Sequence, residues 1–121
     1  METLESVEIK AFIPAKDYEK SKRFYQQLGF SMESDEQGIA YFRHGDCSFL
    51  LQDFYNADHA NNFMMHLLVK DVDSWYQSVK KSGVAGDFAV KLLDVKDQPW
   101  GMRDFVFYDP SGVVWRIAEN I

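Results

Sequence analysis

A repeated helix signature constrains the fold of this 121-residue chain more than any other feature. DYEKSKRFYQQLG runs from Asp17 to Gly29, and DVDSWYQSVKKSG runs from Asp71 to Gly83. In each segment the aspartate can cap the first helical turn, the glycine can end the helix, and apolar residues recur at helical spacing. The two predicted helices start 54 residues apart (71 − 17), which indicates a duplicated structural unit.

Short runs that alternate apolar and polar residues flank both helices, as is typical of strands with one buried face. We predict strands from VEIKAFI (7–13), FSMES, GIAYFRH and CSFLLQD in the first unit, and from FMMHLLV, FAVKLLDV (88–95) and a hairpin over 98–120 in the second. The order predicts two βαβββ units, at 5–53 and 63–121, joined by a polar linker at 54–62. Each unit is too small to bury its sheet alone, so we expect a shared core.

Composition excludes several classes of function. The formal net charge is −6 and no basic cluster is present, which argues against nucleic acid as a partner. No apolar run reaches membrane-spanning length. Cys47 is the single cysteine, so we expect no disulfide framework, a buried thiol on the helix-packed side, and a reducing compartment. METLESVEIK carries acidic residues where a signal peptide needs positive charge, and we therefore expect a cytoplasmic protein.

Three segments together resemble one known superfamily. IPAKDYEKSKRFYQQLGF, LLVKDVDSWYQSVKKSGV and WGMRDFVFYDPSGVVWRI are similar to the vicinal oxygen chelate group, which includes glyoxalases, bleomycin-resistance proteins, fosfomycin-modifying enzymes and extradiol dioxygenases. The resemblance covers essentially the whole chain and implies one α+β domain over 1–121. Its two βαβββ modules would form a cupped, eight-stranded mixed sheet that holds the ligand. Members of this size commonly form homodimers.

The resemblance also implies four positions for a divalent metal, one on the first and one on the last strand of each module. Histidine and glutamate usually occupy them. Carried over residue by residue, the four positions are Lys10, Leu50, Met64 and Arg116. Two cationic side chains, an aliphatic one and a thioether do not suit a hard divalent ion. We therefore predict no metal, no cofactor and no catalytic residue, and we lean away from an enzyme.

The same strands predict a binding surface. Counting alternate positions places Lys10, Phe12, Leu50, Gln52, Met64, His66 and Arg116 on the cup face, together with one of Tyr41 and Phe42, which the count leaves open. By resemblance, Trp100 and Arg103 border the mouth of the cup. The predicted ligand-binding residues are Lys10, Phe12, Tyr41, Leu50, Gln52, Met64, His66, Trp100, Arg103 and Arg116.

Three of these residues have a structural interpretation beside the functional one. His66 either hydrogen-bonds a ligand or is satisfied by its polar neighbours. Arg116 either binds an anion, stacks on an aromatic ring, or forms an internal ion pair. Trp100 either stacks on a planar or cationic ligand or packs at a dimer contact.

These residues favour a metal-free protein that binds a small organic molecule and sequesters it without chemistry, as bleomycin-resistance proteins do. The net negative charge suits a cationic drug, whereas Lys10 and Arg116 inside the cup suit an anion. The sequence therefore does not decide between a drug and an aromatic or anionic metabolite as the ligand. One alternative is a metal-dependent lyase, isomerase or dioxygenase-like enzyme of the same superfamily. A second alternative is a protein-interaction module whose cup is vestigial.

Overall fold

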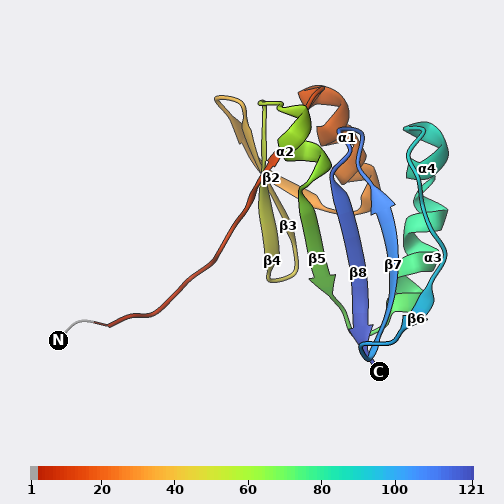
Figure 1. Ribbon diagram of the computed structural model, residues 1–121. Coiled ribbons are helices and arrows are strands. Elements are labelled where there is room, and N and C mark those ends of the chain that lie inside the picture. Colours follow the sequence, from red (N-terminus) through yellow and green to blue (C-terminus); the bar gives the residue numbers. More distant parts are fainter. Residues whose placement is uncertain (1–2) are drawn as a thin grey trace.

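The computed structural model describes residues 3–121, so the first two residues of the acidic N-terminal segment lie outside it. The chain follows the predicted order of two βαβββ units with two extra short helices (Figure 1). The first unit comprises β1 (Phe12–Pro14), α1 (Tyr18–Leu28), β2 (Ser31–Glu36), β3 (Ile39–His44) and β4 (Cys47–Gln52). The second comprises β5 (Met64–Leu68), α3 (Val72–Ser82), β6 (Lys96–Gln98), β7 (Met102–Tyr108) and β8 (Val114–Asn120). The extra helices are α2 (Ala57–Asn61) and α4 (Val84–Asp87).

Both predicted helices are confirmed, and they begin and end as their capping residues require. The Asp17 carboxylate accepts a hydrogen bond from the Lys20 backbone N–H, and Asp71 accepts one from Ser74. Gly29 and Gly83 adopt φ angles of 118° and 78°, in the left-handed region that residues with a side chain disfavour. No helix among the described residues has the length and hydropathy needed to cross a membrane.

The eight strands lie in two four-stranded sheets. The N-terminal sheet has the order β1-β4-β3-β2, and the C-terminal sheet has the order β5-β8-β7-β6. In each sheet the first and last strands of the module pair in parallel, and the other neighbours are antiparallel. The α+β class and the two mixed sheets are confirmed, although no strand pairing between residues 3 and 121 joins the expected eight strands into one sheet.

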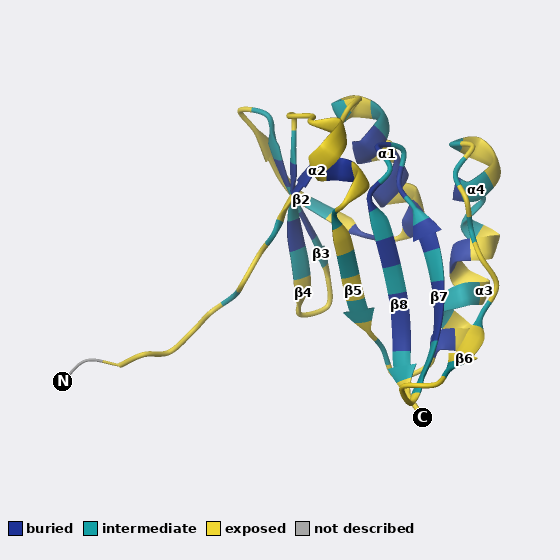
Figure 2. Cartoon of the chain, in the orientation of Figure 1, coloured by how far each residue is buried: buried dark blue, intermediate teal, exposed yellow. Residues whose placement is uncertain are grey.

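One core lies between the two sheets. Helix α1 contacts β2 and β4, helix α3 contacts β7 and β8, and the two helices contact each other. The ring of Tyr25 on α1 lies 4.8 Å from Phe49 on β4, and Phe49 lies 5.3 Å from Trp115 on β8. Burial alternates along β3, β4 and β8, as Figure 2 shows, so each sheet turns one face to this core. The other face of each sheet, which no helix covers, is called its open face below.

A buried polar bond joins the two modules. The Tyr25 hydroxyl donates to the Asp109 carboxylate at 2.6 Å and accepts from the Trp115 indole N–H at 2.9 Å. Asp109 also accepts the backbone N–H groups of Ser111 and Val113 in the predicted turn of the hairpin. Burial raises the pKa of Asp109 to about 6, although these hydrogen bonds act in the opposite direction.

Two predicted strands are shorter than expected. In place of a strand over 7–13, only 12–14 pair with β4, and the chain before β1 forms an extended arm that projects outward (Figure 1). In place of a strand over 88–95, the chain forms one isolated bridge, Leu92 to Phe107, before β6 begins at Lys96. Helix α4 precedes this stretch and Ala89 has a φ of 53°, so the backbone turns where a strand would have to run straight.

Two further details differ from the sequence prediction. The expected linker 54–62 contains α2, which Asn56 caps and which buries Ala60. Cys47 is exposed rather than buried, because it stands at the first position of β4 beside the His44–Gly45–Asp46 turn. Alternation along a strand predicts the face on which a side chain lies. It does not show whether the neighbouring element extends far enough to cover that side chain.

Candidate functional site

The open face of the C-terminal sheet carries a hollow of about 480 Å³ near its β6 edge. Trp100 lies in the turn between β6 and β7 and is 60% exposed, and Leu93 beside the hollow is also exposed. Their apolar surfaces meet a polar group formed by Gln98, Asp104 and Arg116. A concave apolar surface with a few converging polar groups is typical of a site for a small organic molecule.

An internal ion pair forms the polar end of this hollow. Arg116 Nη1 donates to Asp104 Oδ2 at 2.8 Å, and Gln98 Nε2 donates to Asp104 Oδ1 at 2.9 Å. Asp104 is only 1% exposed, whereas the Arg116 side chain keeps 26% of its surface in contact with solvent. The internal ion pair, which sequence analysis left as one alternative for Arg116, is present and compensates its charge within the chain.

Sequence reasoning missed Asp104 although a signal was present. Asp104 stands two residues before Val106, which pairs with Arg116, and alternate residues of a strand share a face. Counting back from the buried Phe105 and Phe107 would have placed an acidic residue on the open face, within diagonal reach of Arg116.

His66 and Met64 lie on the same open face. His66 is paired in register with Arg116, and Met64 with Val114, so both project from the edge strand β5 beside the centre of the sheet. Met64 is 56% exposed and His66 is also exposed. The C-terminal sheet thus brings together four of the predicted residues, namely Met64, His66, Trp100 and Arg116.

The open face of the N-terminal sheet carries a second group, namely Lys10, Phe12, Tyr41, Leu50 and Gln52. Phe12 pairs with Leu50, and Leu50 with Tyr41, so these three residues form one row across the sheet. Phe42 is fully buried, and Tyr41 therefore is the member of the pair that faces outward.

Glu8, which the sequence prediction also omitted, organises the polar part of this face. Its carboxylate accepts from Lys10 at 2.9 Å, Tyr41 at 2.8 Å, Arg43 at 3.2 Å, and the hydroxyl of Ser48. The hydrogen bond from Ser48, followed by those from Lys10 and Tyr41, lowers the pKa of Glu8 to about 2. Lys10 is consequently paired rather than free to bind an anion.

The two groups do not share one cup within the chain. Both sheets turn their other faces to the common core, and Figure 1 shows the C-terminal sheet face-on while the N-terminal sheet is nearly edge-on. Arg103 belongs to neither group. It lies on the helix-facing side of β7, where its guanidinium pairs with Asp73 on α3 at 3.0 Å and with Asp97 at 2.9 Å.

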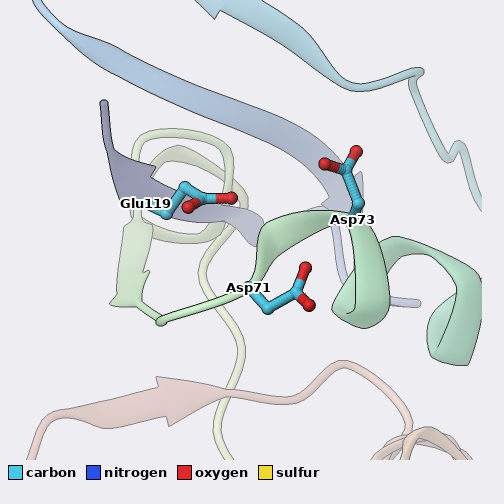
Figure 3. A group of neighbouring side chains, drawn as sticks. All are labelled: Asp71, Asp73 and Glu119. Atoms are coloured by element: carbon cyan, nitrogen blue, oxygen red, sulfur yellow. The ribbon is translucent and has the colours of Figure 1, made fainter.

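The residues at the superfamily's metal positions do not fit a metal. Lys10 is paired with Glu8, Arg116 is paired with Asp104, and Leu50 and Met64 offer no oxygen or nitrogen ligand. Within residues 3–121, one other group of potential ligands gathers, namely Asp71, Asp73 and Glu119 at the start of α3 and the end of β8 (Figure 3).

These three carboxylates already have partners in the fold. Asp71 caps α3, Asp73 binds Arg103, and Glu119 accepts the backbone N–H of Val72 at 3.1 Å. The cluster is mostly exposed and lies at one end of the C-terminal sheet. Its stabilising contacts at the start of α3 therefore explain why these carboxylates lie together.

The sequence comparison decides the family. Residues 7–117 match the family profile described as the Glyoxalase/Bleomycin resistance protein/Dioxygenase superfamily. The chain belongs to this superfamily. The match extends from the arm before β1 into β8, so it covers both modules and confirms the resemblance inferred from the helix and hairpin motifs.

Relatives within the superfamily include antibiotic-binding proteins. A bleomycin resistance protein from Klebsiella pneumoniae is 24% identical over 114 residues, which cover 89% of this chain and 88% of that protein. A bleomycin-binding protein from Streptomyces verticillus, solved with copper(II)-bleomycin, has a TM-score of 0.81 at 20% identity and covers 98% of this chain and 100% of its own. TnmS3, an antibiotic binding protein from Streptomyces sp. CB03234, has a TM-score of 0.76 at 25% identity, with coverages of 99% and 100%.

Proposed function

We propose that this superfamily member binds a small organic molecule, an antibiotic of the bleomycin type, and protects the cell by sequestering it without chemistry. The observation that carries the proposal is the hollow on the open face of the C-terminal sheet, where exposed Trp100 adjoins the compensated Arg116–Asp104 pair. Sequestration requires affinity alone, and the residues at the metal positions are unsuited to the metal chemistry of the superfamily's enzymes.

The two cationic side chains that the sequence placed in the cup do not favour an anion. Both cationic side chains that suggested an anion in the sequence, Lys10 and Arg116, have carboxylate partners. The chain carries a net charge of −6, which attracts cations over long range. Trp100 offers an exposed indole ring, on which a planar or cationic group can stack.

We further propose that the protein acts as a homodimer in the cytoplasm. The two groups of candidate residues lie on open faces that do not meet within one chain, so two copies related by a twofold axis can each contribute one wall to a cup. The single exposed thiol of Cys47 suits a reducing compartment. In this proposal the modules are residues 5–53 and 63–121 of one domain, and both contribute to each site.

Direct titration of the purified protein with bleomycin, followed by calorimetry and by tryptophan fluorescence, tests the binding proposal. We expect saturable binding at one site per chain, and a ligand concentration of one hundred times Kd should raise the free energy of unfolding by about 2.7 kcal/mol. Trp100→Ala should weaken binding by about tenfold or more, since exposed aromatic anchors dominate such contacts.

Phe54→Ala is the matched control, because Phe54 is an exposed aromatic residue that lies outside both candidate groups. The affinity of the Phe54→Ala variant for bleomycin should equal that of the unmodified protein. Absence of binding to bleomycin, with or without copper, would overturn the proposed ligand. Recovery of a chemically altered drug would replace sequestration with catalysis.

A further inference from the structure

A cavity of about 380 Å³ lies on the helix side of the fold, away from both open faces. The end of α1, the end of β3 and the first turns of α3 border it, so both modules contribute to its lining. His44 shares a face of β3 with the buried Phe42, which places His44 on the core side of the N-terminal sheet. The lining includes Leu28, Phe30, His44, Ser74, Trp75 and Ser78.

Three aromatic rings form a corner of this cavity. The centre of the His44 ring lies 5.9 Å from that of Phe30 at an angle of 68°, and 4.7 Å from that of Trp75 at 57°. Phe30 is buried, Trp75 is half-buried and His44 is exposed, so the corner deepens from the surface towards the core. A planar ring that enters the corner can contact His44 and Trp75 together in offset or edge-to-face geometry.

The polar rim of the cavity accepts hydrogen bonds. Ser74 and Ser78 are four residues apart on α3 and therefore lie on the same face of the helix. The Ser74 hydroxyl donates to Asp71 Oδ2 at 2.7 Å, which leaves its oxygen able only to accept from a ligand. The hydrogen bonds from Ser74 lower the pKa of Asp71, so a negative charge is held next to this rim at neutral pH.

The end of α1 adds to the same electrostatic preference. Leu28, the last residue of α1, lines the cavity, and the last turn of this helix contains no basic residue. The carboxyl end of a helix carries a partial negative charge and favours a cation. Among residues 3–121, no lysine or arginine lines the cavity. The cavity therefore favours a ligand that donates hydrogen bonds or carries a positive charge.

We propose that this cavity is a second ligand site, which binds a small planar aromatic molecule that carries an amine. The ring occupies the corner formed by Phe30, His44 and Trp75, and the protonated amine faces Ser74, Ser78 and the end of α1. The volume is at the lower end of the range for small-molecule sites and suits one or two fused rings. None of the lining residues belongs to the open faces, so the site is independent of the proposed antibiotic binding.

Tryptamine, an indole with an ammonium group, is the probe that tests the site. Titration of the full chain, followed by ¹H–¹⁵N NMR, should shift the Trp75 indole signal, assigned with Trp75→Phe, with a Kd of about 1 mM or lower. The Trp100 indole signal should not move in parallel. Indole-3-acetate has the same ring but a carboxylate, and it should bind at least about tenfold more weakly.

Absence of a saturable shift at Trp75, or a saturable shift at Trp100 alone, would overturn the proposed site. Equal affinities for tryptamine and indole-3-acetate would overturn the proposed preference for an amine.

Two pairs of variants test which residues form the site. Ser78→Leu places a larger side chain in the cavity and should weaken tryptamine binding by about tenfold or more, with unchanged circular dichroism. Gln77→Leu is the matched control, because Gln77 is an exposed neighbour on α3 that does not line the cavity. His44→Ala should weaken binding by about fivefold, whereas His59→Ala, outside the cavity, should not change it.

Bleomycin titration of the Ser78→Leu variant separates this site from the open-face site. The affinity for bleomycin, if the proposed function is correct, should equal that of the unmodified protein. Loss of bleomycin affinity in this variant would contradict the independence of the two sites. A Ser78→Leu variant that binds tryptamine as tightly as Gln77→Leu does would refute the cavity as its site, whatever the outcome for bleomycin.

Discussion

Tyr25→Phe removes one buried hydroxyl and should reveal how strongly the two modules depend on each other. The substitution keeps the ring in its aromatic core but leaves the Trp115 N–H without an acceptor and the Asp109 carboxylate without its Tyr25 donor. An unsatisfied buried polar group costs about 1–3 kcal/mol, and more when it is charged. We therefore expect a loss of about 2–4 kcal/mol in the free energy of unfolding at pH 7.5.

The loss should depend on pH because it involves the ionised form of Asp109. Burial raises the pKa of Asp109 to about 6, from an ordinary value of 3.8. The stability contributed by this group is fully present below the unfolded pKa and is lost as the pH rises through 6, by about 3 kcal/mol in total. The Tyr25 hydrogen bond favours the charged carboxylate, so Tyr25→Phe should cost less at pH 4.5, where folded Asp109 is protonated, than at pH 7.5.

Urea unfolding at pH 4.5 and 7.5, followed by tryptophan fluorescence at fixed protein concentration, measures both effects. Tyr76→Phe is the control, because the Tyr76 hydroxyl donates to Asp94 at a similar 2.7 Å but on the surface. It should cost no more than about 0.5 kcal/mol. The buried hydrogen bond does not stabilise the pairing of the modules if Tyr25→Phe lowers the free energy of unfolding no more than Tyr76→Phe does. An equal loss for Tyr25→Phe at both pH values would contradict the role of ionised Asp109.

Three further predictions follow from single contacts. Arg116→Ala leaves the buried Asp104 carboxylate without its cation and should cost about 3 kcal/mol in urea unfolding, most of which Arg116→Ala/Asp104→Ala should restore. Ser48→Ala removes the main cause of the low pKa of Glu8, so a carboxyl NMR titration should find that pKa shifted from about 2 towards 4.5, and an unchanged value would contradict this assignment. Asp71→Ala should cost about 1 kcal/mol in the same urea assay, since the cap of α3 is lost, and an unchanged midpoint would refute that role.

Local signals in the sequence predicted the helices and the hairpin because their causes lie within a few residues. Asp17 and Asp71 cap their helices through contacts three residues away, and Asp109 organises the turn between β7 and β8 by bonds to residues two and four positions on. The strands over 7–13 and 88–95 were overestimated because pairing depends on distant partners. An alternating pattern states which face should be buried but not which chain or strand will bury it.

The candidate site was predicted less completely for the same reason. The face of each strand residue followed from its alternation, so Leu50, Met64 and Arg116 lie on the open faces as expected. Alternation could not predict which charged residues form ion pairs. Asp104 contacts Arg116 on the neighbouring strand, and Glu8 contacts the sheet from a segment outside it. The sequence therefore left the carboxylate partner of Arg116 unnamed and gave none for Lys10, whereas the fold pairs them with Asp104 and Glu8.

The bond between Tyr25 and Asp109 has a consequence for the symmetry of the duplicated fold. α1 and α3 are both eleven residues long and start 54 residues apart, yet the α3 position equivalent to Tyr25 is the buried aliphatic residue Val79. The halves are thus alike in backbone but distinct in chemistry. A first half that docked onto another first half would bury a hydroxyl without a carboxylate, so this one contact discriminates the correct pairing of halves from a mismatched one.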